Sequence, residues 1–164
     1  MKRFAVAFTG PSNSGKTTLI VKIAEKLILN HEVAIVKHDP KDKARFDTEG
    51  KDSYKFTQTG AHTVVVSDNK TTYFSPKSKT IDEIVDMVKD FDYLLVEGLK
   101  TLPLPRIAIF REKIDESYLP YSEAIAIDES VDISAYEIPD RISVLDLNDT
   151  DAIIAWIEKN AKQV

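Results

Sequence analysis

The residues from Gly10 to Thr17 form the pattern G-x-x-x-x-G-K-T, which is typical of a phosphate-binding loop. Glycines let the backbone turn tightly, so that successive N–H groups converge on phosphate oxygens at a helix N-terminus. In such a loop Lys16 reaches the β- and γ-phosphates, and the Thr17 hydroxyl helps to hold Mg²⁺. We therefore expect nucleoside-triphosphate binding by Gly10, Ser12, Asn13, Ser14, Gly15, Lys16, Thr17 and Thr18.

An acid, Glu97, directly follows the apolar run Tyr93–Val96 and is a second candidate for chemistry. A buried strand that ends in a carboxylate is typical of the Walker-B segment, which lies beside the Mg²⁺ of the nucleotide. Glu97 is longer than the usual aspartate, so it could contact the metal through water or orient an attacking water. An acid that caps a helix or a turn would give the same pattern.

Two further candidates, His38 and Asp39, follow the strand pattern from Glu32 to Val36. Asp39 could complete the Mg²⁺ shell or act as a base on an acceptor, and His38 could bind phosphate or a metal. The alternative is a solvated, charged loop, because Pro40 and several lysines follow directly.

The identity of the base is not encoded in the motifs of signalling GTPases. The stretch Asp47–Gly50 formally matches D-x-x-G, but no buried strand precedes it, and the stretch Asn69–Thr72 lacks the aspartate of N-K-x-D. Asp128 follows the apolar segment Ile125–Ile127 and could accept hydrogen bonds from the N1–H and N2–H₂ groups of guanine. An ordinary turn beginning at Asp128 explains the same residues.

The elements that must position these residues alternate between strand and helix patterns, which favours βαβ units and a mainly parallel sheet. Ligands of such sheets bind beyond the carboxyl ends of the strands, so the candidate residues should converge on one edge. We expect an α/β fold of the P-loop NTPase type, with three layers and a β-hairpin extension. The expected strands are Phe4–Phe8, Glu32–Val36, Tyr93–Val96, Arg106–Phe110, Ala124–Ile127 and Ile142–Leu147, with a hairpin over Val64–Val66 and Thr71–Phe74. The expected helices are Thr18–Leu29, a short one from Asp52 or Ser53 to Gln58, one opened by a capping box at Thr80–Glu83, and one from about Thr150 that buries Ile153, Trp156 and Ile157.

Composition restricts the functional class. The length of 164 residues fits a single nucleotide-binding domain over residues 1–164. A formal charge of −5 argues against nucleic acid as a partner, and the absence of cysteine excludes disulfides and thiolate sites. No apolar run approaches the length of a membrane span, and the first strand pattern begins too early for a signal peptide. We expect a cytoplasmic protein that does not bind membranes.

Taken together, these segments resemble the molybdopterin-guanine dinucleotide biosynthesis protein B family over residues 4 to about 111. The resemblance rests on the P-loop, on Lys37-His38-Asp39, on Gly50-Lys51-Asp52-Ser53, on Gly60-Ala61 and on Val96-Glu97-Gly98 with Lys100 two residues later. One departure is Pro40-Lys41, which stands where family members usually have further histidines.

The resemblance implies a GTP-binding, weakly hydrolysing homodimer that assists the guanylyltransferase joining GMP to molybdopterin, and it leaves open direct contact with molybdopterin. It assigns phosphate contacts to Gly15, Lys16, Thr17 and Thr18, and Mg²⁺ to Thr17 with Glu97 and Asp39 nearby. The residues themselves make Lys16, Glu97 and Asp39 the candidates for catalysis. The alternative is a P-loop kinase that transfers the γ-phosphoryl group of ATP to a hydroxylated small molecule, with Asp39 or Glu97 as its base. No arginine-rich lid segment supports the kinase.

Overall fold

The structure, a computed structural model, describes residues 2–164 and contains two compact units. The sheet unit comprises the chain up to His38 together with Asp90–Val164, and the hairpin unit comprises Asp39–Lys89. No helix within residues 2–164 is long and apolar enough to cross a bilayer.

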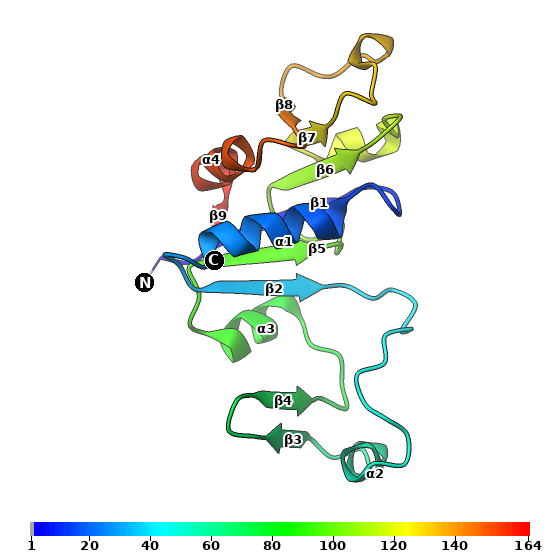
Figure 1. The fold of residues 1–164 in the computed structure, drawn as a ribbon, viewed down its shortest axis with the longest axis vertical. Coiled ribbons are helices and arrows are strands. Elements are labelled where there is room, and N and C mark those ends of the chain that lie inside the picture. The colour runs from blue at the N-terminus through cyan, green and yellow to red at the C-terminus, as the bar shows by residue number, and fades with distance from the viewer. Residues whose placement is uncertain (1) are drawn as a thin grey trace. The chain divides into compact units, whose positions relative to one another are not determined.

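The sheet unit is built on a seven-stranded sheet whose main path runs β2-β5-β1-β6-β7-β8, with every neighbouring pair parallel (Figure 1). A short strand, β9, pairs antiparallel with β1. The expected mainly parallel sheet is therefore confirmed. The strands are β1 (Phe4–Thr9), β2 (Val33–Lys37), β5 (Tyr93–Glu97), β6 (Arg106–Phe110), β7 (Ala124–Ile127), β8 (Ser143–Asp146) and β9 (Lys162–Gln163).

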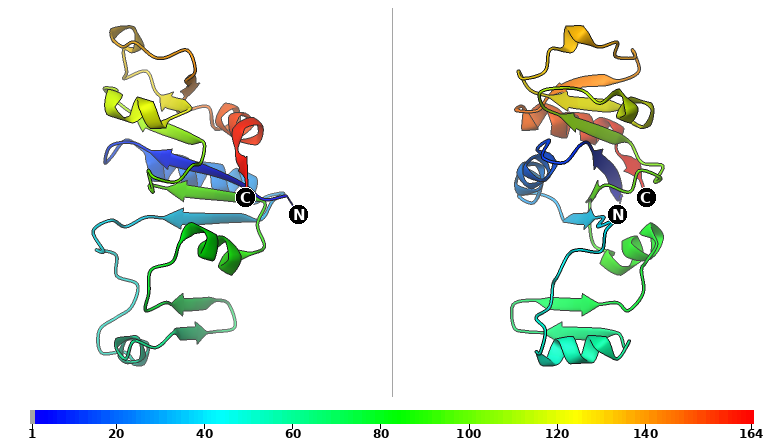
Figure 2. Two further views of the ribbon diagram at one scale, coloured as in Figure 1. Left: turned by 180° about the vertical axis from the view of Figure 1, so that it is seen from behind. Right: turned by 90° about the vertical axis from the view of Figure 1, so that its right-hand side faces the viewer.

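Two apolar clusters lie on opposite faces of this sheet, because strand side chains alternate between faces. One cluster packs Phe8 and Ile109 against the helices α1 (Lys16–Leu27) and α4 (Thr150–Asn160), which lie on the same side of the sheet in Figure 2. The other packs Phe110 against Leu119 of the 3-10 helix η1 (Glu116–Tyr121). A second 3-10 helix, η2, spans Ile133–Ala135.

The helix boundaries differ from the expected ones at α1. The helix begins at Lys16, inside the P-loop motif, and ends at Leu27, two residues before the apolar pattern does. Ile28 and Leu29 are exposed, because the chain turns there through hydrogen bonds to the Leu27 carbonyl. In α4 Ile153 and Ile157 are buried as expected, whereas Trp156 is only half-buried at the margin of the cluster.

The hairpin unit contains α2 (Asp52–Gln58), the antiparallel strands β3 (Thr63–Val66) and β4 (Thr71–Phe74), and α3 (Ile81–Val88). The strands β3 and β4 form a two-stranded sheet of their own, which confirms the expected hairpin. The capping box is also present, since the Thr80 hydroxyl accepts from the Glu83 amide while the Glu83 carboxylate accepts from the Thr80 amide.

Candidate functional site

The loop between β1 and α1 has the backbone geometry that a phosphate-binding loop requires. Gly10, Asn13 and Gly15 have φ angles of 138°, 63° and 95°, in the left-handed region that favours glycine. A Cβ at Gly10 would lie 2.4 Å from the backbone carbonyl oxygen of Ile109 in β6, so a side chain is excluded there. The loop thus turns its peptide groups inward at the start of α1, as an anion-binding nest does.

The hydroxyl of Ser14 is buried in this loop. Its Oγ atom lies 3.1 Å from the place where a Gly10 Cβ would be, and it has no hydrogen-bond partner among residues 2–164. Buried polar atoms of native proteins are nearly always paired, so an unpaired hydroxyl at this position fits a ligand with oxygen acceptors.

Lys16 folds back over the loop. Its Nζ donates to the carbonyl oxygens of Gly10 and Pro11, at 3.0 and 2.6 Å. Burial lowers the pKa of Lys16 from its ordinary value, the charge of Glu97 raises it in part, and Lys37 lowers it further. Among residues 2–164 the bonded partners of this amine are thus two neutral carbonyls, with no directly bonded carboxylate.

Arg111 completes the cavity above the P-loop. This cavity has a volume of about 330 Å³ and is lined by Asn13, Gly15, Lys16, Thr17, Thr18 and Arg111. The guanidinium of Arg111 lies 3.5 Å from the position that a Gly15 Cβ would take. Arg111 directly follows β6, and its contact with the P-loop follows from the pairing of β6 with β1.

Asp128, at the turn that follows β7, is paired with Arg111. Its carboxylate accepts hydrogen bonds from the hydroxyl and amide of Ser130 and pairs with Arg111, whose Nε lies 3.2 Å from Oδ2. The Ser130 hydroxyl and the positive charge of Arg111 hold the pKa of Asp128 below its ordinary value. The structure thus links Asp128 to the P-loop through Arg111, and its contact with guanine stays a prediction.

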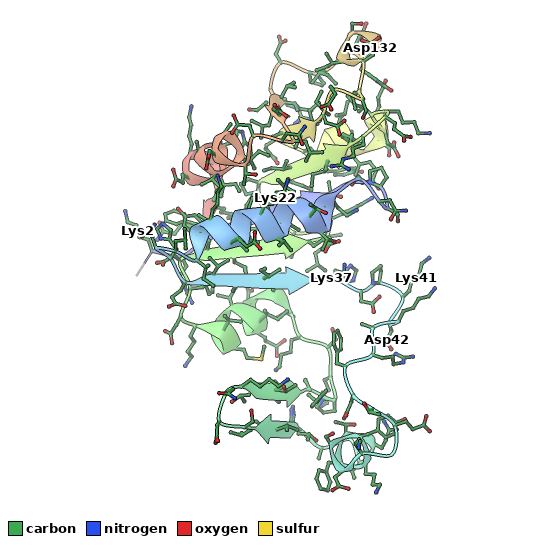
Figure 3. The ribbon with its side chains drawn as sticks, viewed as in Figure 1. Lys2, Lys22, Lys37, Lys41, Asp42 and Asp132 are labelled. Carbon is green, nitrogen blue, oxygen red and sulfur yellow. The ribbon has the colours of Figure 1, made fainter. Side chains whose placement is uncertain are left out.

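Glu97 and His38 are brought together at the carboxyl edge of the sheet. β5 lies between β2 and β1, so that Glu97 is in register with both Lys37 and Phe8. The Lys37 Nζ lies 3.0 Å from Glu97 Oε2, and Figure 3 shows Lys37 at the end of β2. His38 Cβ lies 3.1 Å from the place of a Gly98 Cβ, and the His38 amide donates to the Glu97 carbonyl.

Asp39 begins the hairpin unit, where its carboxylate accepts hydrogen bonds from the amides of Lys41 and Ala44. Within residues 2–164 no three His, Cys, Asp or Glu side chains are grouped as a metal site. The parts assigned to Asp39 in metal binding and catalysis stay predictions.

The sheet order, the loop after β1 and the helix that follows define a fold of the P-loop NTPase type. The hydrogenase maturation factor HypB from Archaeoglobus fulgidus shares this fold, with a TM-score of 0.54 at 18% identity over 96% of this chain and 87% of that one. A model of the family described as molybdopterin guanine dinucleotide synthesis protein B matches residues 5–129, and the chain belongs to that family.

Individual relatives agree with this assignment. A molybdopterin-guanine dinucleotide biosynthesis adapter protein of Haemophilus influenzae is 32% identical over 161 residues, which cover 93% of this chain and 86% of the relative. The corresponding Escherichia coli protein is 29% identical over 94% of this chain and 93% of its own. The crystal structure of Bacillus subtilis MobB has the same fold, with a TM-score of 0.76 at 23% identity, covering 96% and 98% of the two chains.

Proposed function

We propose that this protein binds GTP with Mg²⁺ and acts as an adapter in the synthesis of molybdopterin-guanine dinucleotide. The observation that carries the proposal is the loop between β1 and α1, where Gly10 admits no side chain and Lys16 has only neutral acceptors. A triphosphate would replace those acceptors and accept from the loop amides and from Ser14. The relatives named as adapter proteins of this pathway supply the biological context.

The residues at the edge of the sheet fit a magnesium ion. Mg²⁺ prefers oxygen ligands and is usually held by one or two protein groups, with phosphates and water completing the shell. The Thr17 hydroxyl at the start of α1 and the Glu97 carboxylate at the end of β5 are oxygen donors of this kind. Because Glu97 is bonded to Lys37, the metal would compete with that lysine for the carboxylate. When bound, Mg²⁺ neutralises charge on the β- and γ-phosphates.

Slow hydrolysis is the turnover that this arrangement favours. Lys16 and Arg111 would withdraw charge from the phosphates, and Glu97 would at most orient a water, because Lys37 already engages its carboxylate. The Asp128 carboxylate would accept hydrogen bonds from the N1–H and N2–H₂ groups of guanine after separating from Arg111. The roles that we propose for His38 and Asp39 are contacts with phosphate or with the metal.

The partners that we propose are a second copy of this chain, the guanylyltransferase of the pathway and the molybdopterin to which that enzyme joins GMP. We place these interactions in the cytoplasm. The hairpin β3–β4 is the proposed contact surface, because Val64 and Val66 are 55% and 72% exposed in a sheet of only two strands. Val66→Asp should shift the protein from dimer to monomer in sedimentation analysis, and an unchanged dimer would exclude this surface.

The function is tested by titrating the protein with GTP and ATP in the presence of Mg²⁺ and then following hydrolysis. GTP should bind in preference to ATP, and its turnover should stay well below the rate of about ten per second that is typical of enzymes. Lys16→Ala should abolish nucleotide binding while the circular dichroism and the thermal unfolding midpoint stay unchanged, because Lys16 is bonded to the loop and not packed in the core.

The same experiment addresses the alternative activity. Rapid consumption of ATP that depends on a hydroxylated acceptor would identify a kinase and overturn the adapter proposal. Unchanged GTP affinity in the Lys16→Ala variant would overturn the assignment of the P-loop itself.

A further inference from the structure

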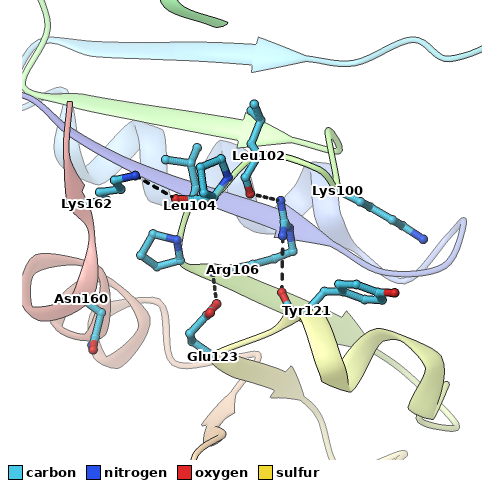
Figure 4. Close-up of a pocket in the computed structure, with 10 residues that line it drawn as sticks. Lys100, Leu102, Leu104, Arg106, Tyr121, Glu123, Asn160 and Lys162 are labelled. Atoms are coloured by element: carbon cyan, nitrogen blue, oxygen red, sulfur yellow. Dashed lines mark hydrogen bonds between the residues drawn. The ribbon is translucent and has the colours of Figure 1, made fainter.

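A second and larger cavity, of about 650 Å³, lies in the sheet unit away from the P-loop. Its wall includes the connection from β5 to β6, the end of η1 and the C-terminal strand β9 (Figure 4). Arg106 lines this cavity, whereas the next residue of β6, Ile107, packs in the cluster under α1. Since successive strand residues face opposite ways, the cavity opens on the face of the sheet opposite α1.

The most unusual group in this cavity is the guanidinium of Arg106, a residue that is only 3% exposed. Its Nη2 donates to the carbonyl oxygens of Leu99 and Leu102, at 3.0 and 3.3 Å, and its Nη1 to that of Tyr121 at 3.4 Å. Its Nε is buried and has no hydrogen-bond partner among residues 2–164. Burial lowers the pKa of this guanidinium and the charge of Glu123 raises it in part, so Glu123 offsets only some of the cost of burying the charge. A second anion in the cavity would offset more of that cost.

Further cations surround Arg106. Lys100 lies over the ring of Tyr118, with Nζ 4.1 Å from the ring centroid, and the Lys162 Nζ donates to the Pro103 carbonyl at 3.2 Å. Among the described residues that line the cavity Glu123 is the one acid, and its Oε2 accepts from the backbone amide of Arg106 at 2.7 Å. Figure 4 shows Lys162 and Lys100 at opposite ends, with Arg106 between them and Glu123 below. The lining is therefore positive in balance, with a carboxylate near its middle.

The remaining wall is apolar and stiff. Leu102, Pro103, Leu104 and Pro105 form one continuous stretch of it, and the exposed ring of Tyr121 stands at the rim. Proline fixes the backbone φ angle, so this stretch loses little conformational freedom when a ligand binds. Cavities of about 300–1,000 Å³ with apolar walls and a few polar groups are typical of sites for small molecules.

We propose that this cavity binds a small phosphorylated heterocycle, namely a pterin that carries a phosphate monoester. The net positive charge of Lys100, Arg106 and Lys162 would attract the phosphate, the flat ring would lie against the apolar wall and Tyr121, and Glu123 would accept from the amino edge of the ring. This inference rests on the proposed function, because it identifies the ligand as the pterin of that pathway. It gives the protein two separate sites for phosphorylated ligands.

The test uses two fluorescent probes, a pterin with a phosphate ester on its 6-side chain and the same pterin without the phosphate. Each is titrated into the full-length protein with a non-hydrolysable GTP analogue and Mg²⁺ present at saturation. The phosphorylated pterin should bind one to one and about tenfold or more tightly than its dephosphorylated counterpart, because charge-assisted hydrogen bonds carry that difference.

Variants connect this binding to the cavity. Lys100→Ala and Lys162→Ala should each weaken binding of the phosphorylated pterin about tenfold while leaving the dephosphorylated pterin unaffected. The matched control is Lys26→Ala, which removes the same charge from α1 on the opposite face of the sheet and breaks only an exposed pair with Asp151. Glu123→Gln should weaken both probes equally, since its contact is with the ring.

Three results would overturn the inference: equal affinity for the two probes, unchanged affinity in both lysine variants, or displacement of the pterin by the GTP analogue. Binding of the GTP analogue is measured in the same samples. If GTP binds and the phosphorylated pterin does not, this inference fails and the proposed function stands; if neither binds, both fail.

Discussion

The two cavities of the sheet unit that we propose as sites for phosphorylated ligands are built in different ways. The P-loop cavity is formed mainly by consecutive residues, and the phosphate donors that we propose there are backbone amides of a loop with positive φ angles at Gly10 and Gly15. The cavity around Arg106 is formed by side chains from segments as distant as Lys100 and Lys162. A site made of backbone amides, such as the P-loop cavity, depends on a few φ angles that cannot change. A site made of side chains, such as the cavity around Arg106, distributes its charge over several residues.

This difference predicts how single substitutions affect ligand binding at each cavity. One added methyl group can close a backbone cradle, because the main chain cannot move aside in a close-packed sheet. Removal of one lysine from the second cavity leaves the other lysine and Arg106 in place. We therefore expect abrupt loss of function at the first cavity and graded loss at the second.

Among the variants that test this difference between the cavities, the largest effect is expected for Gly10→Ala. The new Cβ would lie 2.4 Å from the Ile109 carbonyl oxygen at a φ of +138°, so the loop must leave the position that its amides need. GTP affinity should fall about 100-fold or more through the loss of charge-assisted contacts, and unfolding should cost about 2–4 kcal/mol less. Calorimetric titration and urea unfolding measure the two effects, and binding of the phosphorylated pterin at the second cavity should persist.

Gly60→Ala is the matched control, because Gly60 also has a positive φ, of +81°, but no atom lies within 4 Å of a Cβ there. It should cost about 1 kcal/mol of stability from backbone strain alone and leave GTP affinity intact. If the two variants bound GTP equally well, the close approach of Gly10 to β6 would have no functional role.

Arg111→Ala tests the side chain that follows β6 and lines the P-loop cavity from outside the loop. GTP affinity should fall about tenfold, since one charge-assisted contact with phosphate is lost. The fold should be unaffected, because the pair with Asp128 is partly exposed and such pairs add little stability. Arg111→Lys should restore part of the affinity, and affinity equal to that of the unaltered protein in Arg111→Ala would show that this guanidinium does not face the nucleotide.

The contrast between the cavities also explains what could be predicted from the sequence. The P-loop, the hairpin and the capping box at Thr80 are local, so residue types at fixed spacing were sufficient to predict them. The strands were recognised as apolar runs, and their parallel arrangement followed from the alternation with helices. Even the end of α1 was misjudged by two residues, because Ile28 and Leu29 continue the apolar pattern into an exposed turn.

Contacts between segments that are distant in the sequence could not be predicted. Arg111 lies over Gly15 only because β6 pairs with β1, with Ala108 opposite Thr9, and nothing in either segment encodes that partner. The second cavity depends on the same kind of information, since β9 joins the sheet beside β1 and carries Lys162 to the wall. Arg106 looked like an ordinary residue at the start of a strand, and only its burial reveals its charge as exceptional.

The smallest expected effect is a dependence of GTP affinity on pH. It belongs to the P-loop cavity, because the amine of Lys16 can lose its proton there, whereas the guanidinium of Arg106 in the second cavity stays charged. Burial favours the neutral amine, so the pKa of Lys16 in the nucleotide-free protein lies below its ordinary value. The amine is charged below that pKa and loses its charge as the pH rises through it. A bound phosphate favours the charged form, so binding takes up a proton as the pH rises through the lowered pKa of Lys16. GTP affinity should therefore decline with rising pH in a range that lies below the ordinary pKa of lysine.

Lys16→Arg isolates this effect, because a guanidinium stays protonated throughout that range. Any titration of guanine itself is common to both proteins, so the difference between their affinity profiles reports on Lys16 alone. Parallel profiles would mean that Lys16 keeps its proton over the whole range, and that burial of its amine is too slight to affect binding. If GTP affinity declines with pH only in the protein that has lysine at position 16, burial of the charged Lys16 amine costs free energy in the nucleotide-free protein. The bound phosphates would then offset that cost.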